Sequence, residues 1–104
     1  LSSSSAASDV YKRQDLDRRL KAAGIDTVVI AGLMTHACVA GAARDAVPLG
    51  YQVIVAEDAC ATRDLDTRHG VVPHAELHRA TLAALADTFG DIMTTDEVVA
   101  LPGR

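Results

Sequence analysis

Cys38 is the side chain of this sequence best suited to covalent chemistry. It closes the segment MTHAC (34–38), which lies between an apolar, strand-like run and a segment with helical periodicity. The first turn of a helix presents unpaired N–H groups and the positive end of the helix dipole, which favour an anion. With Thr35 as the N-cap, Cys38 stands at about N3, a position where cysteine thiols are often nucleophilic.

Two other roles stay open for Cys38. The first is a small hydrophobic residue in the core, because cysteine is among the most frequently buried residue types. The second is a thiol redox pair with Cys60, the only other cysteine. The two lack CxxC spacing, so we expect both thiols to be free in a reducing compartment.

Other polar side chains carry weaker signals. His74 and His78 are four residues apart on an expected helix, where two imidazoles can chelate a metal ion, although a solvated helix surface is the more frequent role. Arg63 and Asp64 lie in a long polar connection after a strand, which covers a site or makes a subunit contact. Alternatively, the two residues pair with each other or with neighbours in a solvated loop.

Alternating strands and helices position Cys38. Thr27 to Ala31 is an unbroken, β-branched apolar run, typical of a strand buried on both faces of a parallel sheet. Helical periodicity predicts helices over Asp15 to Ala23 and Thr35 to Val47, and a second strand is predicted over Tyr51 to Ala56. This order is that of a parallel α/β sheet, with Cys38 beyond the carboxyl end of the first strand.

The second half of the chain continues the alternation. A long polar connection, which we expect to be a loop, follows Asp58 and leads to a helix from about Pro73 to Phe89. Five residues are expected to line one face of that helix: Leu77, Thr81, Ala84, Leu85 and Thr88. A short strand over Asp91 to Thr94 precedes a capping box, Thr94 to Glu97, which opens a final helix to Leu101.

The composition is typical of one small globular domain. Of 104 residues, 49% are hydrophobic, 23% charged and 3% aromatic. The net charge of -4 comes from acidic and basic residues mixed along the chain, so we expect no nucleic-acid partner. No apolar run approaches the roughly 20 residues that cross a bilayer, and the N-terminus lacks the apolar core of a signal peptide. We therefore expect a cytoplasmic protein with no membrane partner.

Four motifs, in this order, resemble one known family. They are GLMTHACV (32–39), AARDAVPLGY (42–51), VIVAEDACATRD (53–64) and TTDEVVAL (94–101). Together they look like the C-terminal half of an isochorismatase-like cysteine hydrolase, a family that includes nicotinamidases and related amidases. The resemblance implies an α/β fold with a three-layer α/β/α, Rossmann-like parallel sheet, partial here. We interpret residues 15–104 as the C-terminal half of that domain.

The resemblance implies roles for the residues around Cys38. In that family an aspartate and a lysine activate a cysteine, which attacks an amide carbonyl to form an acyl-enzyme, and Cys38 matches the cysteine. A cis peptide bond is implied between Leu33 and Met34, with the backbone N–H groups of Met34 and Cys38 as the oxyanion hole. Thr35 and His36 are expected near the site.

The family's aspartate and lysine have no counterpart in this chain, since they belong to the N-terminal half of the family domain. We therefore expect the chain to be a fragment that is inactive alone. The resemblance implies a small-molecule substrate with an amide-type C–N bond, because isochorismatases proper lack the cysteine, and His36 makes nicotinamide a weaker candidate. It also implies a homo-oligomer. We expect no cofactor and no metal, since the metal ligands of nicotinamidases lie in the absent half.

The N-terminal segment differs in composition from the remainder of the chain. Leu1 to Gln14 has four consecutive serines and no apolar period, and SSAASDVYKRQ resembles a translated sequencing adapter. We interpret residues 1–14 as non-native or disordered.

Two further function classes are weighed against the hydrolase. One is a non-catalytic half-domain that serves as a binding or assembly module, whose exposed sheet edge pairs with a second copy. The other is a dinucleotide-binding unit, which is disfavoured because the first strand is followed by Gly32 alone and not by GxGxxG.

Overall fold

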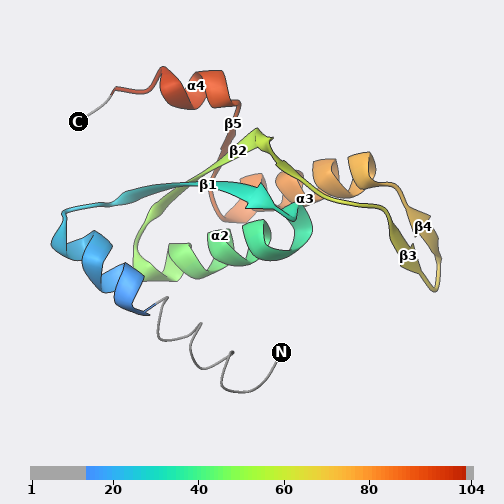
Figure 1. The fold of residues 1–104 in the computed structure, drawn as a ribbon, viewed down its shortest axis with the longest axis horizontal. Coiled ribbons are helices and arrows are strands. Elements are labelled where there is room, and N and C mark those ends of the chain that lie inside the picture. The colour runs from blue at the N-terminus through green and yellow to red at the C-terminus, as the bar shows by residue number, and fades with distance from the viewer. Residues whose placement is uncertain (1–13, 103–104) are drawn as a thin grey trace.

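Three parallel strands form the centre of the fold. The computed structural model describes residues 14–102 (Figure 1). The sheet consists of β1 (Thr27–Leu33), β2 (Gln52–Ala61) and β5 (Asp91–Met93), in the order β1-β2-β5. Both strand pairs are parallel, which confirms the predicted α/β class.

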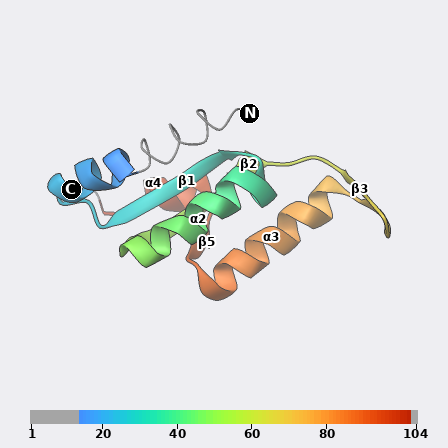
Figure 2. The same cartoon turned by 90° about the horizontal axis from the view of Figure 1, so that it is seen from below.

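Helices alternate with these strands along the chain. Residues 14–22 are helical and precede β1. After β1 come the π-helical turn η1 (Thr35–Val39), the helix α2 (Ala40–Ala46) and the 3-10 turn η2 (Val47–Leu49). Two later helices are α3 (His74–Thr88) and α4 (Thr95–Val99). Figure 2 shows α2 and α3 side by side on one side of the sheet, and Figure 1 places α4 on the side away from α2.

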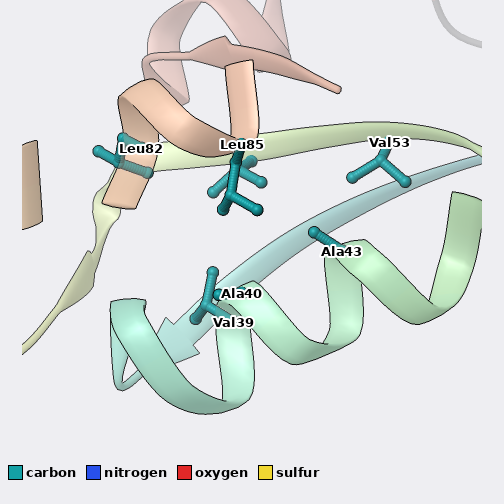
Figure 3. Packing of buried hydrophobic residues seen from close by; sticks show 7 residues of the cluster. Val39, Ala40, Ala43, Val53, Leu82 and Leu85 are labelled. Atoms are coloured by element: carbon teal, nitrogen blue, oxygen red, sulfur yellow. The ribbon is translucent and has the colours of Figure 1, made fainter. Parts of the chain in front are cut away.

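The core lies between the sheet and the layer formed by α2 and α3 (Figure 3). Val55 of β2 and Leu85 of α3 are 0% and 1% exposed, respectively. The other buried members come from η1, α2, β2 and α3: Val39, Ala40, Ala43, Val53 and Leu82. Val28 and Ile30 of β1 pack against this cluster. One face of the sheet is therefore covered by aliphatic side chains from the helix that follows β1 and from α3.

Two expectations about buried faces are wrong in part. The run Thr27 to Ala31 is expected to be buried on both faces, but Val29 is 48% exposed, and Leu33, which lies beyond that run, is 70% exposed. β1 is an edge strand of the described sheet, and its helix-covered face is the one that carries Val28 and Ile30. In α3 the buried residues are Leu82 and Leu85, whereas Ala84 and Thr88 are exposed.

The connection expected to be a loop is largely β-structure. β2 continues to Ala61, five residues beyond the predicted end, and its register with β1 is interrupted between Ile30 and Gly32. An antiparallel hairpin, β3 (Leu65–Thr67) and β4 (Gly70–Val72), follows and extends away from the sheet (Figure 1). The Thr67 hydroxyl donates to the Gly70 carbonyl at 2.7 Å and accepts from the backbone N–H of His69 at 3.1 Å. This side-chain-stabilised turn joins strands that are too short to show a period in the sequence.

The last predicted elements are confirmed. α3 is preceded by Pro73 as its N-cap residue, and β5 covers most of the expected strand. Thr94 and Glu97 form the predicted capping box, with the Thr94 hydroxyl accepting from the Glu97 N–H at 3.2 Å. The Thr94 N–H donates to the Glu97 carboxylate at 2.9 Å.

The interpretation of residues 1–14 concerns a segment that lies outside the described residues except for Gln14, which is helical. The division of the chain into residues 1–14 and 15–104 therefore stays a prediction.

Candidate active site

The turn that carries Cys38 begins at the carboxyl end of β1. The peptide bond between Leu33 and Met34 is cis. The chain then enters η1, where the Val39 N–H donates to the Met34 carbonyl at 3.2 Å, the five-residue spacing of a π-helix. Such turns occur often at functional sites. Cys38 lies within this turn as a free, exposed thiol, so its alternative role as a buried core residue is wrong.

Thr35 is not the N-cap that the sequence pattern predicts. The N-cap residue is Met34, which has an extended backbone and makes no side-chain cap hydrogen bond. Thr35 is the first residue of η1 and is 0% exposed. Its hydroxyl is directed inward, where Oγ1 lies 2.8 Å from Nδ1 of His78. The Thr35 hydroxyl therefore contacts a residue of another helix and does not cap the backbone of its own turn.

His78 of α3 connects η1 to β2. Its Nε2 lies 3.1 Å from the Glu57 carbonyl oxygen, which can only accept a hydrogen bond. Nε2 therefore carries the hydrogen, and in the neutral ring Nδ1 accepts from the Thr35 hydroxyl. Among the described residues, every buried side-chain nitrogen and oxygen has a hydrogen-bond partner. The sequence pattern favours a helix-surface role for His78, which is wrong, and it gives no sign of this contact because Thr35 and His78 are 43 positions apart.

His36 makes a second tertiary contact from the same turn. Its Nδ1 lies 2.6 Å from the hydroxyl oxygen of Thr62, which directly follows β2. Consecutive side chains of η1 thus hold the turn to two different parts of the fold. Thr35 contacts α3, and His36 contacts the segment between β2 and β3.

The acidic residues near the strand ends serve helix termini. One oxygen of Asp58 accepts from both the backbone N–H and the hydroxyl of Thr95, each at 2.7 Å, and these bonds hold the pKa of Asp58 below its usual value. One oxygen of Asp64 accepts from the His74 N–H at 2.7 Å and lies 2.9 Å from His74 Nδ1, which lowers the pKa of Asp64. Asp58 therefore anchors the start of α4 and Asp64 the start of α3.

The remaining candidates do not join Cys38. His74 and His78 have separate partners and share no site, and residues 14–102 contain no group of three or more His, Cys, Asp or Glu side chains that could hold a metal ion. Cys60 is a free thiol, half-buried beside Gly32, and burial raises its pKa. The structure thus leaves Cys38 as the exposed thiol at the end of β1.

Comparison with known proteins assigns the family. The isochorismatase domain model matches residues 6–97. The chain belongs to the isochorismatase family. This confirms the resemblance based on the four sequence motifs, and the parallel sheet with its helices agrees with it.

Relatives and solved structures of this family match over a limited part of their length. YddQ, an uncharacterized isochorismatase family protein of Bacillus subtilis, is 38% identical over 82 residues, which cover 79% of this chain and 46% of YddQ. Maleamate amidohydrolase of Pseudomonas putida is 31% identical over 80 residues, covering 77% of this chain and 33% of the relative. A cysteine hydrolase structure from Pseudomonas syringae pv. phaseolicola has a TM-score of 0.78 at 38% identity, covering 82% of this chain and 40% of that one. The chain therefore spans less than half the length of each of these proteins.

None of the helices in the described part of the chain is long and apolar enough to cross a membrane.

Proposed function

We propose that this chain is the C-terminal part of a cysteine hydrolase that cleaves a C–N amide bond of a small molecule, with Cys38 as the nucleophile. The observation that carries the proposal is the exposed, free thiol of Cys38 in the helical turn that follows the carboxyl end of a parallel strand. Open α/β folds bind their ligands at this edge of the sheet. The similarity to a maleamate amidohydrolase and to a cysteine hydrolase supports an amide substrate and a cysteine mechanism.

In the proposed reaction the Cys38 thiolate attacks the amide carbonyl carbon and forms a C–S bond. The carbonyl oxygen becomes an oxyanion, which the backbone N–H groups of Met34 and Cys38 stabilise. The C–N bond then breaks, the leaving nitrogen takes up a proton, and water hydrolyses the thioester to a carboxylic acid and the free thiol. The aspartate and lysine that activate the thiol come from the remaining part of the family domain, so residues 1–104 alone are expected to be inactive.

The test begins with the DNA that encodes the chain. Sequencing across the codons for Gln14 and Asp15 and several hundred bases upstream is expected to reveal an in-frame region that supplies the aspartate and the lysine. The protein joined to that region is then assayed for ammonia or amine release from small amides, and intact mass spectrometry detects the acyl-enzyme.

Two cysteine variants test the assignment of Cys38. Cys38→Ser is expected to abolish both product and acyl adduct, whereas the matched control Cys60→Ser keeps them because Cys60 is half-buried and is not the proposed nucleophile. Turnover that survives Cys38→Ser contradicts the nucleophile assignment. Turnover by the 104-residue chain itself contradicts its expected inactivity.

A second candidate is an assembly module, favoured by the exposed apolar edge strand. Val29 and Leu33 of β1 are 48% and 70% exposed, and an unpaired strand edge is a template for a further strand. In this proposal the chain forms a homo-oligomer through β1. Sedimentation of the purified chain tests it: a dimer that dissociates on Val29→Lys supports the module, and a monomer at all concentrations excludes it.

A further inference from the structure

We infer that His78 is a positioning residue for the turn that carries Cys38, and that it acts through the hydroxyl of Thr35. The inference rests on the proposed function, because the position of this turn matters for catalysis when Cys38 is the nucleophile. The juxtaposition is between the first residue of η1 and a histidine of α3, 43 positions later in the chain.

The geometry makes His78 a bridge between two backbone segments. Its Nδ1 lies 2.8 Å from the Thr35 hydroxyl oxygen, and its Nε2 lies 3.1 Å from the Glu57 carbonyl oxygen on β2. Thr35 is 0% exposed, so water does not replace the imidazole as its partner. A buried hydroxyl that loses its partner costs more than a bond exchanged with solvent. The bridge therefore fixes where η1 starts relative to the sheet.

Thr35, which His78 holds in place, lies next to Met34, whose backbone groups shape the turn that carries Cys38. Thr35 directly follows Met34, whose carbonyl oxygen accepts from the N–H groups of Ala37 at 3.0 Å and of Val39 at 3.2 Å. The hydrogen bond from Val39 closes the loop of chain, residues 34–39, in which Cys38 lies. The Met34 N–H is one of the two proposed oxyanion donors. A displacement of Thr35 is thus transmitted to the turn and to the thiol within it.

Four substitutions test the contact of His78 with Thr35 separately from its contact with Glu57. Thr35→Val removes the hydroxyl with little change of shape, and Thr35→Ser retains a hydroxyl. His78→Asn places an amide oxygen near the position of Nδ1, where it can still accept from Thr35. His78→Gln places an amide nitrogen near the position of Nε2, where it can still donate to Glu57 but no longer reaches the hydroxyl.

Backbone hydrogen exchange of the 104-residue chain measures how stably the turn η1 is hydrogen-bonded. We expect Thr35→Val and His78→Gln each to accelerate exchange at the amides of Ala37, Val39 and Ala40 by about tenfold, as expected for one lost buried hydrogen bond. The double variant is expected to exchange no faster than either single variant, because both remove the same contact. Thr35→Ser and His78→Asn are expected to restore slow exchange.

Three results overturn the inference: unchanged exchange in both disruptive variants, additive acceleration in the double variant, or equal acceleration at the amides of Val53 and Val55. A further measurement needs no variant. The ring ¹⁵N shifts of His78 are expected to report the tautomer with hydrogen on Nε2, and hydrogen on Nδ1 in the neutral ring also overturns it. Neither readout involves turnover, so failure here is distinguished from failure of the hydrolase proposal, which is read from product and acyl adduct.

Discussion

Replacement of Gly90 by alanine is expected to destabilise this fold, although the same substitution at a permissive site stabilises a protein. Gly90 lies between α3 and β5, beside Val53 of β2. A Cβ atom at Gly90 would lie 2.5 Å from the Val53 carbonyl oxygen and 3.0 Å from its Cβ. Val53 is 3% exposed, in the buried middle strand, so its backbone has little freedom to move away.

Two opposing effects determine how much Gly90→Ala changes the free energy of unfolding. Alanine restricts the unfolded chain and so favours folding by about 0.4 to 1 kcal/mol. Forcing one extra carbon into a packed region costs about 1 to 3 kcal/mol. The expected net loss is about 1 to 2 kcal/mol, which lowers the melting temperature of a domain of this size by about 5 to 15 °C.

Gly41 provides a matched control in α2. A Cβ at Gly41 meets no atom within 4 Å, and alanine is favoured over glycine in a helix by about 0.5 to 1 kcal/mol. Urea unfolding followed by circular dichroism is expected to give opposite signs, with Gly41→Ala more stable and Gly90→Ala less stable than the unmodified chain. If Gly90→Ala is as stabilising as Gly41→Ala, the close approach of Gly90 to Val53 is refuted.

Two further predictions concern the core and the helix anchors. Leu85→Ala is expected to lower the free energy of unfolding by about 2 to 5 kcal/mol, since Leu85 is 1% exposed, while Ala84→Ser on the exposed side stays near neutral in the same urea titration. The pKa of Asp58 is lowered in the folded state, so its contribution is present above the ordinary carboxyl pKa of 3.8 and is lost as pH falls through the folded value. Melting temperatures measured from neutral to acid pH are expected to fall less steeply below about pH 4 in Asp58→Asn, and an unchanged acid slope would contradict the Thr95 contact.

Elements encoded by neighbouring residues could be predicted from the sequence. The strand over 27–31, the turn with Cys38, α3 and the capping box of Thr94 each depend on short-range patterns of apolar period, turn residues or cap residues. The parallel order followed from their alternation. The hairpin was missed because strands of three residues carry too few positions to show alternation, and its turn depends on the Thr67 side chain.

Contacts between distant segments could not be predicted. Thr35 has a side chain that often serves as an N-cap. In the fold its hydroxyl instead contacts His78, which lies 43 residues later in the chain. His78 has the spacing of a chelating pair with His74, yet the two rings bind different groups. In each case residue type was informative about hydrogen-bonding capacity, whereas the fold decided which partner was present.

The contrast between β1 and the turn that follows it has a consequence for function. The turn is held by side-chain contacts from α3 and from the end of β2, all within the described residues. Within residues 14–102, β1 is an edge strand of the sheet, and its side chains Val29 and Leu33 are 48% and 70% exposed. A strand added at this edge pairs the free backbone N–H and C=O groups of β1, whereas Val29, on the face opposite Val28 and Ile30, is covered only by an element that packs on that face. Because β1 ends at Leu33, next to Met34, we expect a strand that pairs with this edge in the proposed larger protein or homo-oligomer also to order the start of the turn that carries Cys38.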